Sequence, residues 1–216
     1  MFGFDLPTII ANIPALMIGF AFHEFAHAWV ADRLGDPTPR SQGRLTLNPI
    51  SHLDLFGTLM ALLYRFGWAK PVMTNPRYYK GNKRRGHMLV SLAGPVMNLL
   101  TAFVVMLLWF LTMHWMQGSA WSSIISRVFE ATMFMNLGLG IFNLLPIPPL
   151  DGFGVLRGLL PGRFDPQLHV LEQYGMIILV ILLFTDIAGN VLYPAMNAIA
   201  NVYQIIITLI LTPFLR

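Results

Sequence analysis

The stretch LMIGFAFHEFAHAWV, residues 16–30, ends the first long apolar segment of this chain and contains three ionisable side chains. The apolar segment begins near Leu6, and its 25 residues exceed the roughly 20 that a helix needs to cross a bilayer. His23 and His27 are four residues apart, a spacing that places both imidazoles on one face of a helix. The stretch therefore predicts a transmembrane helix with two adjacent imidazoles.

Two imidazoles one helical turn apart can bind a single metal ion. Neutral imidazole nitrogens bind zinc at about 2.0–2.1 Å, and a glutamate beside the first histidine acts in this motif as a general base. Charged groups inside a membrane cost at least about 2.5–3.5 kcal/mol each, which disfavours a chance arrangement of these residues. We therefore predict His23 and His27 as zinc ligands and Glu24 as the catalytic base.

The composition indicates a membrane protein. Of the 216 residues, 56% are hydrophobic and 11% are charged, whereas soluble domains have about 25% charged residues. The expected fold is an all-α polytopic membrane protein with five to six transmembrane helices, forming a single domain over residues 1–216 with its core at 7–152 and additional helices at 168–212. The long apolar runs that predict the spans are residues 6–30, 87–113, 128–145, 170–184 and 191–211.

Residues 53–64 form a shorter apolar run, which we interpret as a re-entrant or interfacial helix because twelve residues are too few to cross. Residues 31–52 and 65–85 flank this run and contain ten of the fourteen lysines and arginines. Basic loops stay in the cytoplasm, so we expect both segments there, with the N-terminus outside and the C-terminus inside the cell membrane. The net charge of +4 then reflects membrane topology, and we expect no nucleic-acid partner.

A catalytic zinc usually has three protein ligands, so a third ligand is expected. The chain has no cysteine, which excludes a thiolate ligand. Asp151 ends the proline-rich stretch NLLPIPPLDG, residues 143–152, which follows the predicted span 128–145. That span runs in the same direction as the first one, so Asp151 and the two histidines fall in the same half of the membrane. Asp151 is the best candidate, although an ordinary loop aspartate at the membrane surface remains an alternative.

The two motifs together resemble the site-2 protease family of intramembrane zinc proteases. That family has His-Glu-x-x-His in one transmembrane helix and Asn-x-x-Pro-x-x-Pro-x-Asp-Gly in a later one, and this chain has Asn143, Pro146, Pro149, Asp151 and Gly152 at that spacing. The resemblance implies that Asp151 is the third ligand of one Zn²⁺ per chain. It also implies that Asn143 lies near the substrate or the developing oxyanion. The chain is most similar to the compact group that lacks a PDZ or nucleotide-sensing domain.

Residues 43–48 alternate polar and apolar side chains, a pattern typical of a short strand, and they resemble the membrane-re-entrant β-element of the family. An edge strand could pair with an unwound substrate, so Arg44, Leu45, Thr46 and Leu47 are candidate substrate-binding residues. The alternative is a plain surface turn. Asn98 follows a stretch that also resembles the family, and it is either a contact between helices or a residue facing the substrate.

The predicted function is zinc-dependent hydrolysis of peptide bonds in transmembrane or membrane-proximal protein substrates. One alternative is a metal-ion transporter or metal-binding membrane protein, because intramembrane histidines and aspartates also mark ion pathways. Another is a non-catalytic protein that retains the fold, against which the intact Glu24 argues. His52 and Asp54 form either a second metal site or, as we favour, an ordinary hydrogen-bonded contact.

Overall fold

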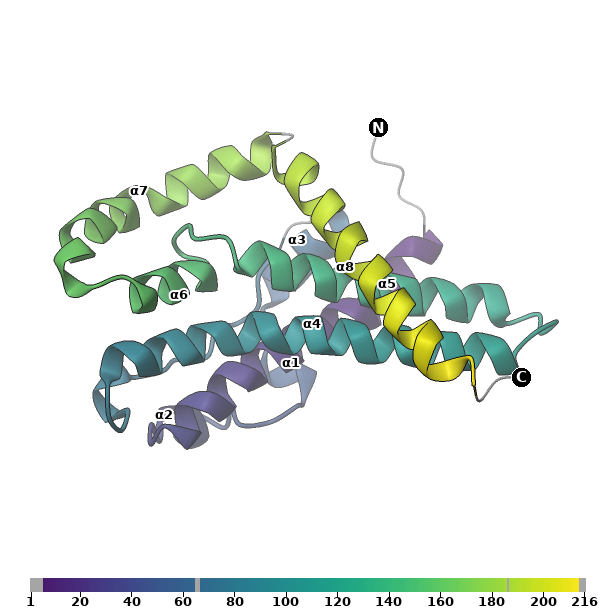
Figure 1. The fold of residues 1–216 in the computed structure, drawn as a ribbon, viewed down its shortest axis with the longest axis horizontal. Coiled ribbons are helices and arrows are strands. Elements are labelled where there is room, and N and C mark those ends of the chain that lie inside the picture. Colours follow the sequence, from purple (N-terminus) through teal and green to yellow (C-terminus); the bar gives the residue numbers. More distant parts are fainter. Residues whose placement is uncertain (1–5, 65–66, 186, 214–216) are drawn as a thin grey trace.

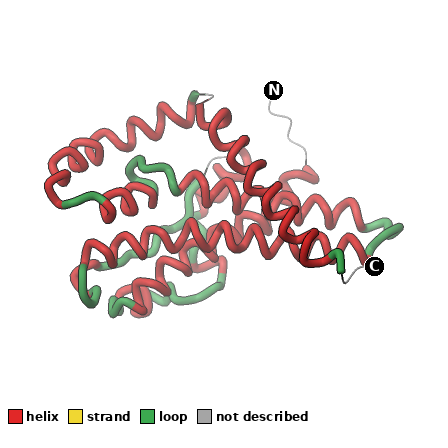
Figure 2. The backbone as a smooth tube through the Cα atoms, viewed as in Figure 1, coloured by secondary structure: helices red, strands yellow, loops and turns green. Residues whose placement is uncertain are grey.

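A computed structural model describes residues 6–64, 67–185 and 187–213, and over this part of the chain the protein consists of helices and connecting loops (Figures 1 and 2). Short 3₁₀ turns occur at Pro49–Ser51, Pro76–Tyr78 and Gly162–Phe164. The α-helices are α1 (Leu6–Arg33), α2 (Thr38–Ser41), α3 (Leu55–Tyr64), α4 (Lys83–Trp115), α5 (Ser122–Asn143), α6 (Asp151–Leu159), α7 (Asp165–Phe184) and α8 (Ile187–Leu211).

The all-helical expectation and the number of long spans are confirmed. In the part of the chain that the structure describes, five segments are long and apolar enough to cross a membrane, at residues 9–33, 83–115, 122–143, 162–183 and 189–211. Residues 53–64 were expected to form a short helix, and α3 is indeed only ten residues long. At 1.5 Å per residue it extends about 15 Å, about half of a hydrocarbon core.

The boundaries of two spans follow from local chemistry. α4 begins at Lys83, four residues before the predicted boundary, because the Asn82 side chain accepts a hydrogen bond of 3.0 Å from the backbone N–H of Arg85. α5 ends at Asn143, shortly before Pro146, which has no N–H to continue a helical ladder. The chain then turns and re-enters a helix at Asp151.

The centre of the molecule is formed by α1, α4 and α5, with α6 packed against α4 (Figure 1). α8 crosses the bundle obliquely and packs mainly on α5. One hydrophobic cluster joins α4, α5 and α8 through the buried residues Ala102, Val105, Met133, Leu137, Met196 and Ala200. A second joins α1 to α3 through Leu16, Phe20 and Ala61. α1 packs on α4 and α5, and its two histidines face α4, where they contact Asn98 and Val90.

The β-element predicted at residues 43–48 is wrong. None of the described residues forms a named strand, and residues 43–48 are a loop of turns and bends. Side chains hold this loop: the Arg44 guanidinium donates to the Ser51 carbonyl, and Nε2 of His52 lies 2.8 Å from the Thr46 carbonyl oxygen. These bonds favour a compact loop over a strand ladder, and the alternation is too short to overcome them. Within the described residues, extended pairing is limited to one antiparallel bridge between Leu53 and Ala69.

Candidate metal centre

His23 and His27 come from adjacent turns of α1, and Asp151 begins α6. All three residues are largely buried, and their ligand atoms lie within 4.8 Å of one another. The two Nε2 atoms are 3.0 Å apart. Oδ2 of Asp151 lies 3.0 Å from Nε2 of His23 and 3.3 Å from Nε2 of His27. The structure thus brings the three sequence-predicted ligands together, although Asp151 is more than a hundred residues from the histidines.

The hydrogen bonds of the two histidines indicate where their protons lie. Nδ1 of His27 is 2.7 Å from the Val90 carbonyl oxygen, which can only accept, so this nitrogen carries a hydrogen. Nδ1 of His23 is 2.5 Å from Oδ1 of Asn98 and donates to it in the same way. In its neutral form, each ring therefore presents the lone pair of Nε2 to the other ring and to Asp151.

Three lone-pair acceptors that face one another repel unless protons or a metal cation lie between them. Oδ2 of Asp151 is buried and has no hydrogen-bond donor in the described part of the chain. Tetrahedral zinc with bonds of about 2.0–2.1 Å separates its ligand atoms by about 3.3–3.4 Å, close to the distances found here. A set of two imidazoles and one carboxylate suits zinc. The residues present therefore fit a zinc ion.

Gly94 of α4 keeps this space open. A Cβ atom built on Gly94 would lie 2.4 Å from Nε2 of His27 and 2.7 Å from Nε2 of His23. Real Cβ atoms essentially never approach other atoms this closely, so any larger residue would push into the ligand atoms. In a sequence, a glycine in an apolar span indicates only close helix contact, so the role of Gly94 beside the ligands emerges from the fold.

Glu24 lies beside His23 on α1 and is also buried. Its Oε2 accepts a hydrogen bond of 2.8 Å from the backbone N–H of Val72, in the loop before α4. This bond holds the carboxylate of the predicted base against a segment 48 residues away. Sequence reasoning could not identify this partner, because a backbone N–H is not specified by residue type.

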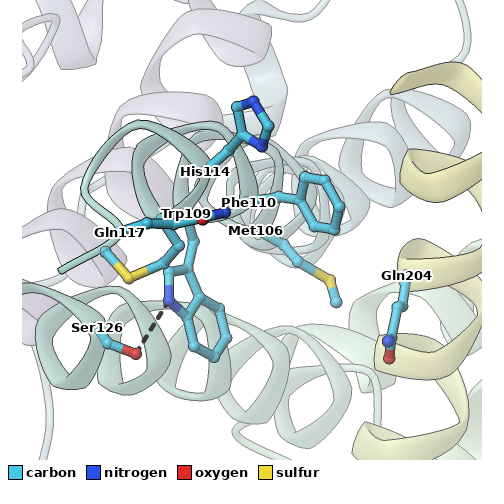
Figure 3. A pocket seen from close by; sticks show the side chains of 8 residues that line it. Met106, Trp109, Phe110, His114, Gln117, Ser126 and Gln204 are labelled. Carbon is cyan, nitrogen blue, oxygen red and sulfur yellow. Dashed lines mark hydrogen bonds between the residues drawn. The ribbon is translucent and has the colours of Figure 1, made fainter. Parts of the chain in front are cut away.

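A cavity of about 430 Å³ reaches Asp151 from the side of α4, α6 and α7. Besides Asp151, its wall includes His87, Ser91, Arg157 and Glu172. It can admit water to one side of the candidate metal centre. A larger cavity of about 470 Å³ lies elsewhere, between α4, α5 and α8, and none of the predicted site residues lines it (Figure 3). Its wall is mainly apolar, with Trp109 donating a hydrogen bond to Ser126.

The predicted substrate-binding residues lie in three different places. Arg44, Leu45, Thr46 and Leu47 belong to the loop before the first 3₁₀ turn. Asn143 ends α5, where its side-chain N–H donates to the Leu139 carbonyl oxygen at 3.0 Å. Asn98 is fully buried behind His23, which is the contact between helices that the sequence had left open. The structure contains no substrate, so substrate contacts of the first two groups stay predictions.

His52 and Asp54 each bond to a nearby backbone group. His52 is fully buried and contacts the Thr46 carbonyl oxygen, while Asp54 accepts a hydrogen bond of 2.8 Å from the backbone N–H of Gly57. Within the described residues, His23, His27 and Asp151 form the single cluster suited to a metal ion. The two residues therefore act in local structure.

A model of peptidase family M50 matches residues 11–114 and 110–185. The chain is 43% identical over 185 residues to YwhC of Bacillus subtilis, named as a zinc metalloprotease, in a match covering 85% of this chain and 84% of that protein. Rip2 of Mycolicibacterium smegmatis, with the same kind of name, is 33% identical over 82% of this chain and 68% of that protein. No solved structure matches. The chain therefore belongs to peptidase family M50, the site-2 protease family, and is a zinc metalloprotease of the membrane.

Proposed function

We propose that this chain is an intramembrane endopeptidase that hydrolyses peptide bonds of transmembrane or membrane-proximal proteins. One zinc ion per chain is held by His23, His27 and Asp151, and Glu24 is the catalytic base. The observation that carries the proposal is the triangle of three acceptor atoms, 3.0 to 3.3 Å apart, beside a buried glutamate in a membrane-spanning helix.

Zinc, when bound, supplies Lewis-acid chemistry that activates water and polarises a carbonyl group. Glu24 accepts a proton from the attacking water at its carboxylate and later gives this proton to the nitrogen of the leaving amine. The Val72 N–H holds one carboxylate oxygen, so the side chain keeps one orientation during both transfers. Asn143 has a second amide N–H besides the one bonded to Leu139, and this N–H is available to a substrate carbonyl.

The proposed orientation places this site in the cytoplasmic half of the membrane. The loop between α1 and α3 and the loop between α3 and α4 contain the basic residues that the positive-inside rule assigns to the cytoplasm. The N-terminus then lies outside and the C-terminus inside. The substrate bond is cut near the cytoplasmic surface, where the cavity beside Asp151 gives water a route.

The test combines metal analysis with cleavage of a model transmembrane peptide in liposomes. The wild-type protein should contain one zinc per chain and cleave the peptide. Glu24→Gln should keep the zinc and lose cleavage, whereas Asp151→Ala should lose both. Cleavage by Glu24→Gln, or full zinc content in Asp151→Ala, would refute these roles. Zinc flux through the wild-type protein would instead favour the transporter.

A further inference from the structure

A row of hydrogen-bonded amides connects α5 through α4 to the metal centre on α1. Asn98 and Asn136 are both fully buried. Nδ2 of Asn136 lies 2.8 Å from the Thr132 carbonyl oxygen, and Nδ2 of Asn98 lies 2.9 Å from Oδ1 of Asn136. The row ends where Oδ1 of Asn98 meets Nδ1 of His23 at 2.5 Å. Asn136 was not singled out by the sequence, and the mechanism above does not use it.

The direction of every hydrogen bond in this row follows from one end. The Thr132 carbonyl oxygen can only accept, so Asn136 must turn its NH₂ group toward it and its oxygen toward Asn98. Asn98 must then donate to Asn136, and its second amide hydrogen is given to the Gly19 carbonyl oxygen at 3.0 Å.

The oxygen of Asn98 is the group left for His23. Nδ1 of His23 therefore carries the hydrogen, and Nε2 carries the lone pair that a metal requires.

We propose that Asn98 and Asn136 are positioning residues that hold His23 in the Nδ1–H tautomer with Nε2 directed at His27 and Asp151. This inference rests on the zinc site proposed above. Metal-bound histidines usually donate their second ring N–H to an acceptor, which fixes the tautomer and the ring orientation. A carboxylate in this place would add a charge inside the membrane, whereas an asparagine supplies the acceptor without one.

An asparagine side chain can present either its oxygen or its NH₂ group to a neighbour, and Asn136 determines which one Asn98 presents to His23. If the Asn98 amide turned over, its NH₂ group would face His23 and force the other tautomer, and the lone pair at Nε2 would be lost. The turned amide would also direct its oxygen at the Gly19 carbonyl and the Asn136 oxygen, leaving buried acceptors without donors. Asn136 and Gly19 together therefore keep the Asn98 oxygen toward His23.

The competing explanation is that the two asparagines only join helices, as buried amides often do in membrane proteins. The two explanations differ in what happens at the metal. We suggest purifying the full chain in detergent, measuring zinc affinity by competition with a chromogenic chelator, and recording the visible spectrum of the cobalt-substituted protein, which depends on ligand geometry.

Four variants separate the explanations. Asn98→Leu should lower zinc affinity by about 10–100-fold and Asn136→Leu by about tenfold, and both should alter the cobalt spectrum. Asn136→Asp should keep the zinc affinity and cobalt spectrum of the wild type. A buried carboxyl is neutral, so it can accept a hydrogen bond from Asn98 while donating one to the Thr132 carbonyl. Ser126→Ala is the matched control: it removes a hydroxyl on the same helix that joins α5 to α4 by accepting from Trp109, outside the row, and it should change neither readout.

Wild-type affinity and spectrum in both leucine variants would overturn the inference, as would an equal loss in Ser126→Ala. If the leucine variants do not fold, the ¹⁵N spectrum of histidine-labelled, metal-free wild-type protein decides: His23, assigned by a His23→Gln sample, should carry its hydrogen on Nδ1. A hydrogen on Nε2 with none on Nδ1 would overturn the inference. If the wild-type protein binds no zinc, the proposed function fails by itself, and the histidine spectrum still tests the tautomer.

Discussion

Replacing Gly94 by alanine should damage the metal centre without disturbing the fold around it. The added Cβ would lie 2.4 Å from Nε2 of His27, whereas ordinary contacts begin at 3.4 Å, so one of the two atoms must move by about 1 Å. The His27 ring cannot easily absorb this displacement, because its Nδ1 is bonded at 2.7 Å to the Val90 carbonyl oxygen of the same α4.

A displacement of this size is large for metal binding. Metal–ligand distances tolerate about ±0.2 Å, and a misplacement of about 1 Å at a catalytic site can cost about 100-fold in rate. We expect Gly94→Ala to lower kcat/KM for a model transmembrane peptide by about 100-fold or more and to weaken zinc binding in a chelator competition. Circular dichroism should still show a helical protein, because alanine is a better helix former than glycine.

Gly138→Ala is the matched control for this experiment. Gly138 lies in the membrane-spanning α5, and the nearest atom to its added Cβ would be Cε of Met196, at an ordinary distance of 3.6 Å. This variant should keep wild-type zinc affinity and cleavage. Gly94→Ala protein that binds zinc and cleaves peptide as the wild type does would refute the argument that Gly94 makes room for the ligands.

Three further experiments test other parts of the structure. Val72→Pro removes the N–H that holds Glu24, and because hydrogen bonds to charged groups contribute about 1.5–3 kcal/mol, kcat/KM should fall roughly tenfold or more while zinc content stays unchanged. Chelation should abolish cleavage and lower the melting temperature, and added zinc should restore both; ligand at 100 times its Kd stabilises by about 2.7 kcal/mol. Leu137→Ala, at a fully buried position of the cluster between α4, α5 and α8, should cost about 2–5 kcal/mol in unfolding free energy with unchanged zinc stoichiometry; a smaller cost would contradict the packing described.

The spans could be predicted from the sequence because the length of an apolar run is enough to identify a membrane helix. Local hydrogen bonds determined where α4 begins and why residues 43–48 form no strand. Asn82 extends α4 toward the N-terminus by capping it, and the alternation at residues 43–48 does not produce a strand because Arg44 and His52 bond to carbonyl groups of a compact loop. Such side-chain bonds compete with regular structure, and a periodic pattern does not reveal which of them will form.

The candidate site was likewise predictable from the sequence only in part. His23, Glu24 and His27 share one helix, so their spacing alone places them together, and the motif around Asp151 supplied the distant third member. The partners that hold these groups were not predictable by such reasoning. The Val72 N–H is a backbone group, and Asn136 bonds to His23 only through another residue. An asparagine in the middle of a membrane span was the available signal, since buried amides in membranes need partners.

The position of α1 in the bundle explains how a membrane protein tolerates this site. Half of the most apolar window of α1 is buried inside the protein, compared with 28% for α5, 22% for α4 and 17% for each of the last two spans. Polar groups facing lipid would lack partners, so the helix with the most enclosed surface is the one that can contain two histidines and a glutamate. Their partners come from α4, α6 and the loop before α4. Enclosure thus lowers the cost of the polar groups, and the same neighbours fix their geometry.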